Sequence, residues 1–358
     1  MNFEKYTEIA LQTLKQLIAI PSFSKDESKV ADVMEQKLKQ FAYATHRKGN
    51  NVWAFNKDFK KGKPVLLLNS HLDTVKPNEN WTRDPFQPEI IDNKLYGLGS
   101  NDAGGCLVSL FATFLALEEI NQHYNIVFVA SAEEEISGKN GFELIQEEIG
   151  NIDVGIVGEP TLMEMAIAEK GLMVLDCEAK GIPGHAARNE GINAIEIAMK
   201  DIEWIHSYQY ALASELLGPV KMTVTQINAG KQHNVIPASC KFVVDVRTNE
   251  HYTNEKAFAI IQEKLESNVV ARSFRMNSSG IPLEHPLVQN GINLGMPYYG
   301  SPTTSDQAIM KGFPTLKLGP GDSARSHTAD EFIYSSEIKD GIEKYFNLLN
   351  GLNLKINS

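Results

Sequence analysis

The chain has 358 residues, of which 42% are hydrophobic and 22% charged, and its formal net charge is −11 at pH 7. This composition is typical of a soluble globular protein, and the length suffices for two compact domains. The negative charge and the lack of a basic stripe argue against a nucleic-acid partner. No apolar run approaches the roughly 18 residues of a membrane helix, and the N-terminus lacks signal-peptide features, so we expect a cytoplasmic protein with no membrane partner.

The cysteines are few and scattered, at Cys106, Cys177 and Cys240. Their odd number and spacing fit neither a disulfide framework nor a Cys-x-x-Cys metal pair. We therefore expect buried structural thiols.

Helix and strand patterns alternate in the first part of the chain. A capping box at Ser24-Lys-Asp-Glu27 is predicted to open the second helix. The apolar runs between the helices are typical of strands buried on both faces of a sheet. The pattern predicts an α/β sandwich with helices on both faces. The expected helices cover residues 5–20, 25–42 and 103–119, and the expected strands cover residues 65–68, 126–130 and 152–157.

The pattern changes near residue 172. Three segments alternate apolar and polar residues, as half-exposed antiparallel strands do. They lie at 173–179, 221–227 and 240–247, with helices expected at about 191–206 and 253–267. A buried strand at 315–318 and a helix at 336–350 then resume the first pattern. We predict a catalytic α/β domain from residues 1–172 and 281–358, with a smaller α+β domain, 173–280, inserted into it.

Candidate metal ligands follow the predicted strands. His71-Leu-Asp73 comes directly after one strand, and side chains two residues apart on an extended segment point the same way. Asp73 can then orient the His71 ring toward a metal. Asp102 lies in a glycine-rich loop before a helix, where a carboxylate can bridge two cations. Each pattern alone also fits an ordinary structural role, a capping or turn aspartate.

Further carboxylates stand at the ends of other strands. Glu133, Glu134 and Glu135 follow one strand, and adjacent carboxylates repel one another unless a cation or solvent compensates. Glu159 follows the next strand, and His327 follows a glycine-rich loop. Ligands of α/β sheets gather at this edge. Two histidines and several carboxylates form a donor set that suits zinc, with cobalt or manganese as substitutes, and two such metals can activate a shared water.

Over almost its whole length, this ordered set of motifs resembles a family of co-catalytic zinc metallopeptidases. That family includes acetylornithine deacetylase, succinyl-diaminopimelate desuccinylase, aminoacylase and glutamate carboxypeptidase. The resemblance rests on Ser70-His71-Leu-Asp73-Thr, Gly97-Leu-Gly-Ser-Asn-Asp102, Ala130-Ser-Ala-Glu-Glu134-Glu135, Gly158-Glu159-Pro-Thr and His327-Thr-Ala-Asp-Glu331.

The resemblance implies a role for each position. His71, Asp102 and Glu159 would hold one zinc, and Asp102, Glu135 and His327 the other. Glu134 would be the general base, and Asp73 would orient His71. The triple glutamate leaves two registers open: Glu134 as base with Glu135 as ligand, which we favour, or the same pair shifted by one residue.

The inserted segment resembles the lid and dimerisation domain of the family. Lys180-Gly-Ile-Pro-Gly-His185-Ala matches a segment whose histidine stabilises the developing oxyanion in the partner subunit's site. This implies a homodimer with His185 catalytic in trans, reached by lid closure. The usual proline is absent from the following stretch, Arg188-Asn-Glu.

Substrate-binding residues follow from the same resemblance. Asn234 lies in a matching His-Asn segment, and Arg247 suits a substrate α-carboxylate, although an exposed strand residue is the alternative. Thr304 lies where the family has a Gly-Thr-Asp loop, but Pro302 and Thr303 replace its glycines.

Length and the Gly158-Glu-Pro-Thr and Leu318-Gly-Pro-Gly321 stretches look most like acetylornithine deacetylases, which implies an N-acyl-amino-acid substrate and arginine biosynthesis. Alternatives are an N-acyl-citrulline or succinyl-diaminopimelate deacylase, a dipeptidase or carboxypeptidase, a single-metal amidase, and a catalytically inactive binding protein. Both histidines and every predicted carboxylate are present, which argues against the last.

Overall fold

The computed structural model describes residues 1–188 and 190–354. The chain divides into two compact units. The first contains Met1–Ile167, Gly280–Tyr299 and Ser305–Ser358, and the second contains Ala168–Ser279 and Gly300–Thr304.

Gly300–Thr304 departs from the prediction, which placed it in the catalytic domain with the rest of residues 281–358. The reason is local bonding. Thr304 Oγ1 donates to the backbone oxygen of Lys170 at 2.7 Å, and Arg247 Nη1 lies 3.4 Å from the same hydroxyl. A Cβ on Gly300 would lie 2.4 Å from the backbone oxygen of Leu216, so the segment packs closely on the second unit.

The first unit is built on a 9-stranded mixed sheet whose order begins β1-β2-β6-β3-β7-β17-β8. Strand β3 runs parallel to β6 and β7, and β17 runs parallel to β7. The expected α/β fold is therefore confirmed. The strands are β1 (Thr45–Lys48), β2 (Asn51–Phe55), β3 (Val65–His71), β6 (Asn125–Ser131), β7 (Val154–Val157), β8 (Met165–Glu169), β15 (Ser279–Gly280), β16 (Tyr298–Ser301) and β17 (Thr315–Lys317), with a separate group β4 (Glu89–Ile91), β5 (Lys94–Tyr96) and β18 (Phe332–Tyr334).

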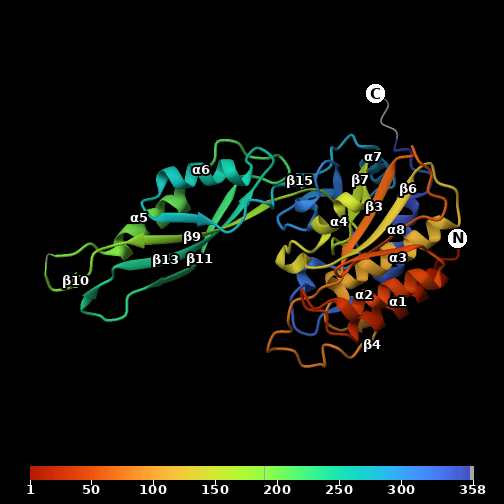
Figure 1. Ribbon diagram of the computed structural model, residues 1–358, viewed down its shortest axis with the longest axis horizontal. Coiled ribbons are helices and arrows are strands. Elements are labelled where there is room, and N and C mark those ends of the chain that lie inside the picture. Colours follow the sequence, from red (N-terminus) through yellow and green to blue (C-terminus); the bar gives the residue numbers. More distant parts are fainter. Residues whose placement is uncertain (189, 355–358) are drawn as a thin grey trace. The chain divides into compact units, whose positions relative to one another are not determined.

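Helices cover both faces of this sheet. Leu66 and Leu68 of β3 join the main hydrophobic core, while Leu67 between them is buried on the opposite face, as expected for a strand enclosed on both sides. Helices α1, α3 and α8 pack against one another on one face, and α4 lies on the other (Figure 1). The helices are α1 (Phe3–Ile18), α2 (Ser28–Gln40), α3 (Gly105–Glu118), α4 (Phe142–Ile149), α7 (Pro286–Asn293) and α8 (Ser335–Leu349), with short turns η1 (Ser100–Gly104), η2 (Glu134–Ile136), η3 (Asp306–Ile309) and η4 (Ser323–Arg325).

Helix α3 is the central helix of this layer. Together with η1 it forms Ser100–Glu118, which by length and composition is apolar enough to cross a membrane, but 89% of that window is buried inside the fold. Burial on all sides explains why its apolar residues form no stripe. The three thiols are free and buried, as expected, and Cys106 lies on this helix.

The predicted capping box at the start of α2 is wrong. The helix begins at Ser28, and its N-cap, Glu27, makes no side-chain cap hydrogen bond. Ser24 Oγ instead donates to Asp73 Oδ2 at 2.7 Å, and the Glu27 carboxylate accepts from the backbone N–H of Lys25 and Glu133. Tertiary partners take both side chains because this segment lies against the strand ends that carry the candidate site.

The second unit contains a four-stranded antiparallel sheet in the order β11-β13-β9-β14. Alternate residues of β9 and β13 are buried, which confirms two of the three predicted half-exposed strands. The third, β11, lies at the edge of the sheet and has no buried residue. Helices α5 and α6 supply the other side of its core. Its elements are β9 (Gly171–Lys180), β10 (Gly184–His185), α5 (Ala194–Ser207), β11 (Lys221–Ala229), β12 (Val235–Ile236), β13 (Ser239–Thr248), α6 (Asn254–Lys264) and β14 (Asn268–Ala271).

Candidate metal centre

The carboxyl ends of the parallel strands bring the predicted ligands together in the first unit. His71 is the last residue of β3, the glutamates at 134 and 135 follow β6, and Glu159 follows β7. Because these strands are parallel, their ends meet at one edge of the sheet. Two groups of three residues could each hold a metal ion, because their ligand atoms lie within 4.8 Å of one another inside the group. The groups are His71 with Glu134 and Glu159, and His71 with Asp102 and Glu135.

Asp102 lies between the two histidines. Its Oδ1 is 3.4 Å from His71 Nε2, and its Oδ2 is 3.5 Å from His327 Nε2. Its backbone is extended within η1, and the peptide bond to Ala103 is cis. The two oxygens of one carboxylate thus face two different sites, as a ligand shared by two cations requires.

Each histidine has its own carboxylate neighbours. His71 Nε2 lies 3.9 Å from Glu159 Oε1, and His327 Nε2 lies 3.0 Å from Glu135 Oε2. The result is one group with His71 and Glu159 and another with His327 and Glu135, joined by Asp102.

Asp73 makes hydrogen bonds through both its backbone oxygen and its carboxylate. The His71 Nδ1 donates to the backbone oxygen of Asp73 at 2.8 Å, while the Asp73 carboxylate is 3.5 Å away. The expected hydrogen bond to the carboxylate is therefore made by the main chain instead. The carboxylate accepts from the backbone N–H of Glu134 and Glu135, at 3.0 and 3.1 Å.

The glutamate triplet divides into one structural and two site residues. Glu133 is buried, has a φ of 56°, and accepts from the backbone and side-chain nitrogens of Asn140. A Cβ on Gly138 would lie 1.9 Å from Glu133 Oε2, so the turn needs glycine there. Glu134 and Glu135 belong to the ligand groups instead. This arrangement supports the register with Glu134 and Glu135 in the site.

Electrostatics at this edge favour a bound cation. Burial, then the neighbouring Glu159, raises the pKa of Glu134 well above its usual value, and burial with Asp102 raises the pKa of Glu159 to about 8. Burial alone would lower the pKa of His71, but Asp102 and Asp73 raise it well above its usual value. His71 Nε2 is buried without a hydrogen-bond partner among the described residues. A divalent cation satisfies this nitrogen and relieves the repulsion, so the residues fit a metal centre.

Two buried carboxylates that we had not assigned support the site. Glu331 accepts three backbone N–H groups, from Gly99 at 3.0 Å, Asn101 at 2.8 Å and Asp102 at 2.9 Å. Asp306 Oδ2 accepts from Ser131 Oγ at 2.8 Å. Glu331 lies in one of the motifs that carry the resemblance, and Asp306 lies in the segment compared with the Gly-Thr-Asp loop. Sequence alone does not distinguish a carboxylate that binds backbone from one that binds a ligand.

The remaining predicted residues lie in the second unit. The ring of His185 accepts from the backbone N–H of Ala187, and the backbone oxygen of Asn234 accepts from Ala186. Both residues are exposed, on a two-stranded β10–β12 ribbon. Arg247 is held by Asp245 through two hydrogen bonds, of 2.8 and 3.0 Å. Asn189, in the stretch without proline, lies outside the described residues.

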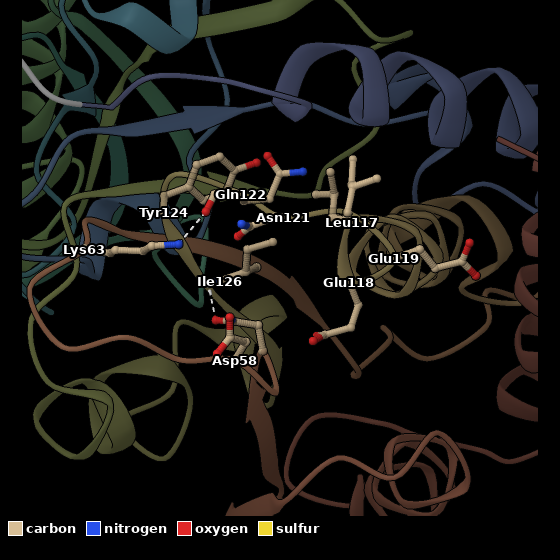
Figure 2. A pocket seen from close by; sticks show the side chains of 11 residues that line it. Asp58, Lys63, Leu117, Glu118, Glu119, Asn121, Gln122, Tyr124 and Ile126 are labelled. Atoms are coloured by element: carbon tan, nitrogen blue, oxygen red, sulfur yellow. Dashed lines mark hydrogen bonds between the residues drawn. The ribbon is translucent and has the colours of Figure 1, made fainter.

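A separate hollow of about 220 Å³ lies at the other end of the sheet, near the start of β6 (Figure 2). Its polar groups are largely bound to the backbone. Lys63 Nζ donates to the backbone oxygen of Gln122 at 2.5 Å, and Glu118 accepts from the backbone N–H of Lys57 at 3.1 Å. These bonds fasten the end of α3 to the strands, so this hollow is distinct from the metal centre.

A family model described as Peptidase family M20/M25/M40 matches residues 67–351. The chain belongs to this family. It is thus a metallo-hydrolase that acts on an amide bond. One solved member is a peptidase from Bacillus subtilis that is described as dinuclear and metal-binding. Its structure matches this one with a TM-score of 0.71 and 15% sequence identity, and the match covers 97% of each chain.

The curated relatives of this M20/M25/M40 chain include several acetylornithine deacetylases. The acetylornithine deacetylase of Buchnera aphidicola subsp. Schizaphis graminum is 30% identical over 78% of this chain and 79% of its own. That of Erwinia tasmaniensis is 28% identical over 92% of this chain and 94% of its own. Among solved structures, aminopeptidase PepT from Bacillus cereus has a TM-score of 0.77 and 19% identity, with coverage of 96% of this chain and 98% of its own.

Proposed function

We propose that this protein is an N-acyl-amino-acid deacylase that binds two zinc ions and resembles acetylornithine deacetylase in its reaction. The observation that carries the proposal is the position of Asp102 between the two histidines, in a chain whose curated relatives include acetylornithine deacetylases. The nitrogen and oxygen donors suit zinc, with cobalt or manganese as substitutes. If the substrate is N-acetyl-ornithine, the enzyme would act in arginine biosynthesis in the cytoplasm.

The chain's residues divide the work as follows. His71, Asp102 and Glu159 hold one cation, and Asp102, Glu135 and His327 hold the other. Two bound cations supply Lewis acidity at the scissile carbonyl and make water easier to deprotonate. Glu134 accepts the proton of the attacking water and delivers it to the departing amine nitrogen. Glu134 lies in one group of possible ligand atoms with His71 and Glu159, which puts its carboxylate beside the proposed cations as this role requires.

Arg247 orients the substrate through its α-carboxylate. Asp245 occupies the Nε and Nη2 edge of the guanidinium, which fixes its plane, and Nη1 faces Thr304 Oγ1 at 3.4 Å. The substrate is therefore expected at the Nη1 side, where Thr304, the other predicted substrate contact of this segment, also lies. Asn234 is the remaining proposed substrate contact.

A homodimer supplies His185 and Asn234 to the partner's site. Within one second unit, β9 and β13 pair from Lys180 opposite Ser239 to Leu172 opposite Arg247. The ribbon with His185 and Asn234 joins the first end, so it lies roughly 25 Å along the sheet from Arg247. One copy cannot bring all of these to one substrate, whereas two copies can. Strand β11 at the edge of the sheet, with Ile227 58% exposed, and Met199 on α5, 62% exposed, suit an interface.

Peptidase activity is the second candidate. The solved structures that this fold matches include tripeptidases and dipeptidases, such as a tripeptidase from Staphylococcus aureus with a TM-score of 0.77 and 20% identity. The chemistry is the same, and the difference lies in the acyl and amine pockets. Among deacylases, N-acyl-citrulline and succinyl-diaminopimelate remain alternative substrates.

A hydrolysis panel on zinc-loaded protein tests the proposal. It contains N-acetyl-ornithine, N-acetyl- and N-succinyl-citrulline, succinyl-diaminopimelate, acetyl-methionine and a Gly-X dipeptide, with Glu134→Gln as the control. Turnover of an N-acyl amino acid that the control lacks supports the deacylase. Turnover restricted to the dipeptide overturns it in favour of the peptidase.

A further inference from the structure

The open face of the second unit's sheet carries a concentration of positive charge beside Arg247. In the strand register, Lys221 of β11 lies directly opposite Arg247 of β13. Directly paired residues of antiparallel strands project from the same face, about 5 Å apart at Cβ, and like charges there are destabilising. The sheet therefore keeps an unfavourable pair at this position.

A third cation joins this pair from the other neighbouring strand. Leu172 of β9 is the partner of Arg247 on that side, and Lys170 lies two residues before it, just outside the strand. Thr304 Oγ1 links the two residues, because it donates to the backbone oxygen of Lys170 at 2.7 Å and lies 3.4 Å from Arg247 Nη1. Lys170 is only 9% exposed, and its Nζ donates to the backbone oxygen of Pro219 at 2.7 Å. Burial, and then Lys221 and Arg247, lower its pKa, which indicates that the three groups sense one another.

A carboxylate pairs with one of these three cations. Asp245 forms its ion pair with Arg247. Neither Lys170 nor Lys221 forms an ion pair with any residue that the structure describes. A buried ammonium with one backbone acceptor and two like-charged neighbours costs stability, and burial of such a charge is normally offset by an anion. The missing partner is therefore expected to come from the ligand.

We propose that Lys170, Lys221 and Arg247 form a subsite for a substrate with a second carboxylate in addition to its α-carboxylate. This inference rests on the proposed deacylase function, which supplies the α-carboxylate. That one carboxylate alone would leave the three cations and Asp245 with excess positive charge. Thr304 connects two members of the subsite, because its hydroxyl donates to the backbone oxygen of Lys170 and accepts from Arg247 Nη1. The second carboxylate can come from a dicarboxylic acyl group such as succinyl, or from an acidic amino-acid side chain.

Matched substrate pairs distinguish these two sources. The acyl arm compares N-succinyl- with N-acetyl-citrulline, and the side-chain arm compares N-acetyl-glutamate with N-acetyl-glutamine. We expect kcat/KM to favour the dianionic member of one pair by at least about 10-fold, as one charge-assisted contact provides. The pair that shows the preference identifies whether the second carboxylate belongs to the acyl group or to the amino-acid side chain. Equal kcat/KM within both pairs overturns the inference but not the proposed deacylase activity.

Charge reversal provides the second test. Lys221→Glu is expected to reduce the preference for the dianionic member by about 10-fold or more. Lys241→Glu is the matched control, because Lys241 lies on β13 and is also exposed, but roughly 20 Å from Arg247 along the strand. Lys170→Arg, which keeps the charge, should retain more of the preference than Lys170→Met. If Lys221→Glu and Lys241→Glu reduce the preference for the dianionic substrate equally, the preference reflects the overall charge of the protein, and the subsite proposal is wrong.

Direct binding separates this inference from the proposed function. Calorimetry on zinc-loaded Glu134→Gln protein measures the Kd of succinate and glutarate against that of butyrate. Tighter binding of a dicarboxylate, lost in Glu134→Gln combined with Lys221→Glu, supports the subsite even if the panel shows only peptide hydrolysis. Equal Kd values for the three acids contradict it.

Discussion

The Asp73 carboxylate accepts the backbone N–H of Glu134 at 3.0 Å. This bond, with its companion to Glu135, fastens the turn that carries the proposed base and one ligand to the strand end that carries His71. A residue that the sequence suggested for one histidine thus positions two glutamates as well.

The substitution Asp73→Asn tests this positioning role. The amide that replaces the carboxylate would present an N–H group to a backbone N–H, which leaves buried donors unsatisfied at a cost of about 1–3 kcal/mol. We expect zinc affinity, measured by chelator competition, to fall by about 10–100-fold, together with kcat. Ser24→Ala is the matched control, since it removes one hydrogen bond to the same carboxylate and keeps both bonds to the backbone. Equal losses in the two variants would contradict the argument.

The register of the glutamate triplet is tested by two identical changes at adjacent positions. Glu134→Gln removes the proposed base, and kcat should fall by about 100- to 10,000-fold with zinc still bound. Glu133→Gln keeps an oxygen that can accept from Asn140, so its kcat should stay within a few-fold of the parent. Single-turnover rates and zinc content by mass spectrometry measure both. A large loss of kcat in Glu133→Gln, with an active Glu134→Gln, would favour the shifted register.

Glu331 is expected to matter for metal binding without touching a metal. Its two oxygens hold three N–H groups of the loop that presents Asp102, and glutamine can accept at only one of them. In Glu331→Gln we expect zinc affinity to fall by about 10–100-fold. The spectrum of the cobalt-loaded variant should change as well, because Asp102 moves. Glu337→Gln, which affects a carboxylate bound to Arg325, is the control, and an unchanged cobalt spectrum in Glu331→Gln would refute the positioning role.

Metal removal should make stability depend on pH in a defined direction. The folded-state pKa is raised to about 8 for Glu159 and Glu331, and to about 9 for His327, the last chiefly by its hydrogen bond to Glu135. Groups with raised pKa bind more protons when folded, so the stability that they contribute is lost as pH rises from their unfolded values through 8 and 9.

Urea unfolding with chelator is therefore expected to show a lower midpoint at pH 9 than at pH 6. The free energy of unfolding should fall by up to about 1.4 kcal/mol per pH unit for each buried carboxyl. With zinc the slope should flatten, because the cations keep the carboxylates ionised and the histidines neutral. A midpoint that rises with pH in chelator would contradict these assignments.

The sequence predicts the parts of this molecule that are set by local patterns. The apolar run before His71 is long enough to identify a buried strand, and parallel strands bring their carboxyl ends together, so candidate ligands are expected at one edge of the sheet. The division of these ligands between two metals came from the family resemblance. The role of Glu331 does not follow, because its three amide partners are far away in sequence. The group around Lys170 was missed for a similar reason. It becomes visible only when the register puts Lys221 opposite Arg247.

The proposed contribution of His185 in trans makes a prediction that activity assays on mixtures can decide. His185→Ala protein should retain its zinc and lose about 100-fold or more in kcat, as for removal of an oxyanion donor. Glu134→Gln protein is inactive for a different reason. A heterodimer of the two contains one site with Glu134 from one subunit and His185 from the other, so activity should return after subunit exchange. Mixing Glu134→Gln with a Glu134→Gln, His185→Ala double variant is the control, because no site in that mixture holds an intact base. If exchange is shown by native mass spectrometry and activity does not return, each site uses its own His185, and the dimer has no catalytic part.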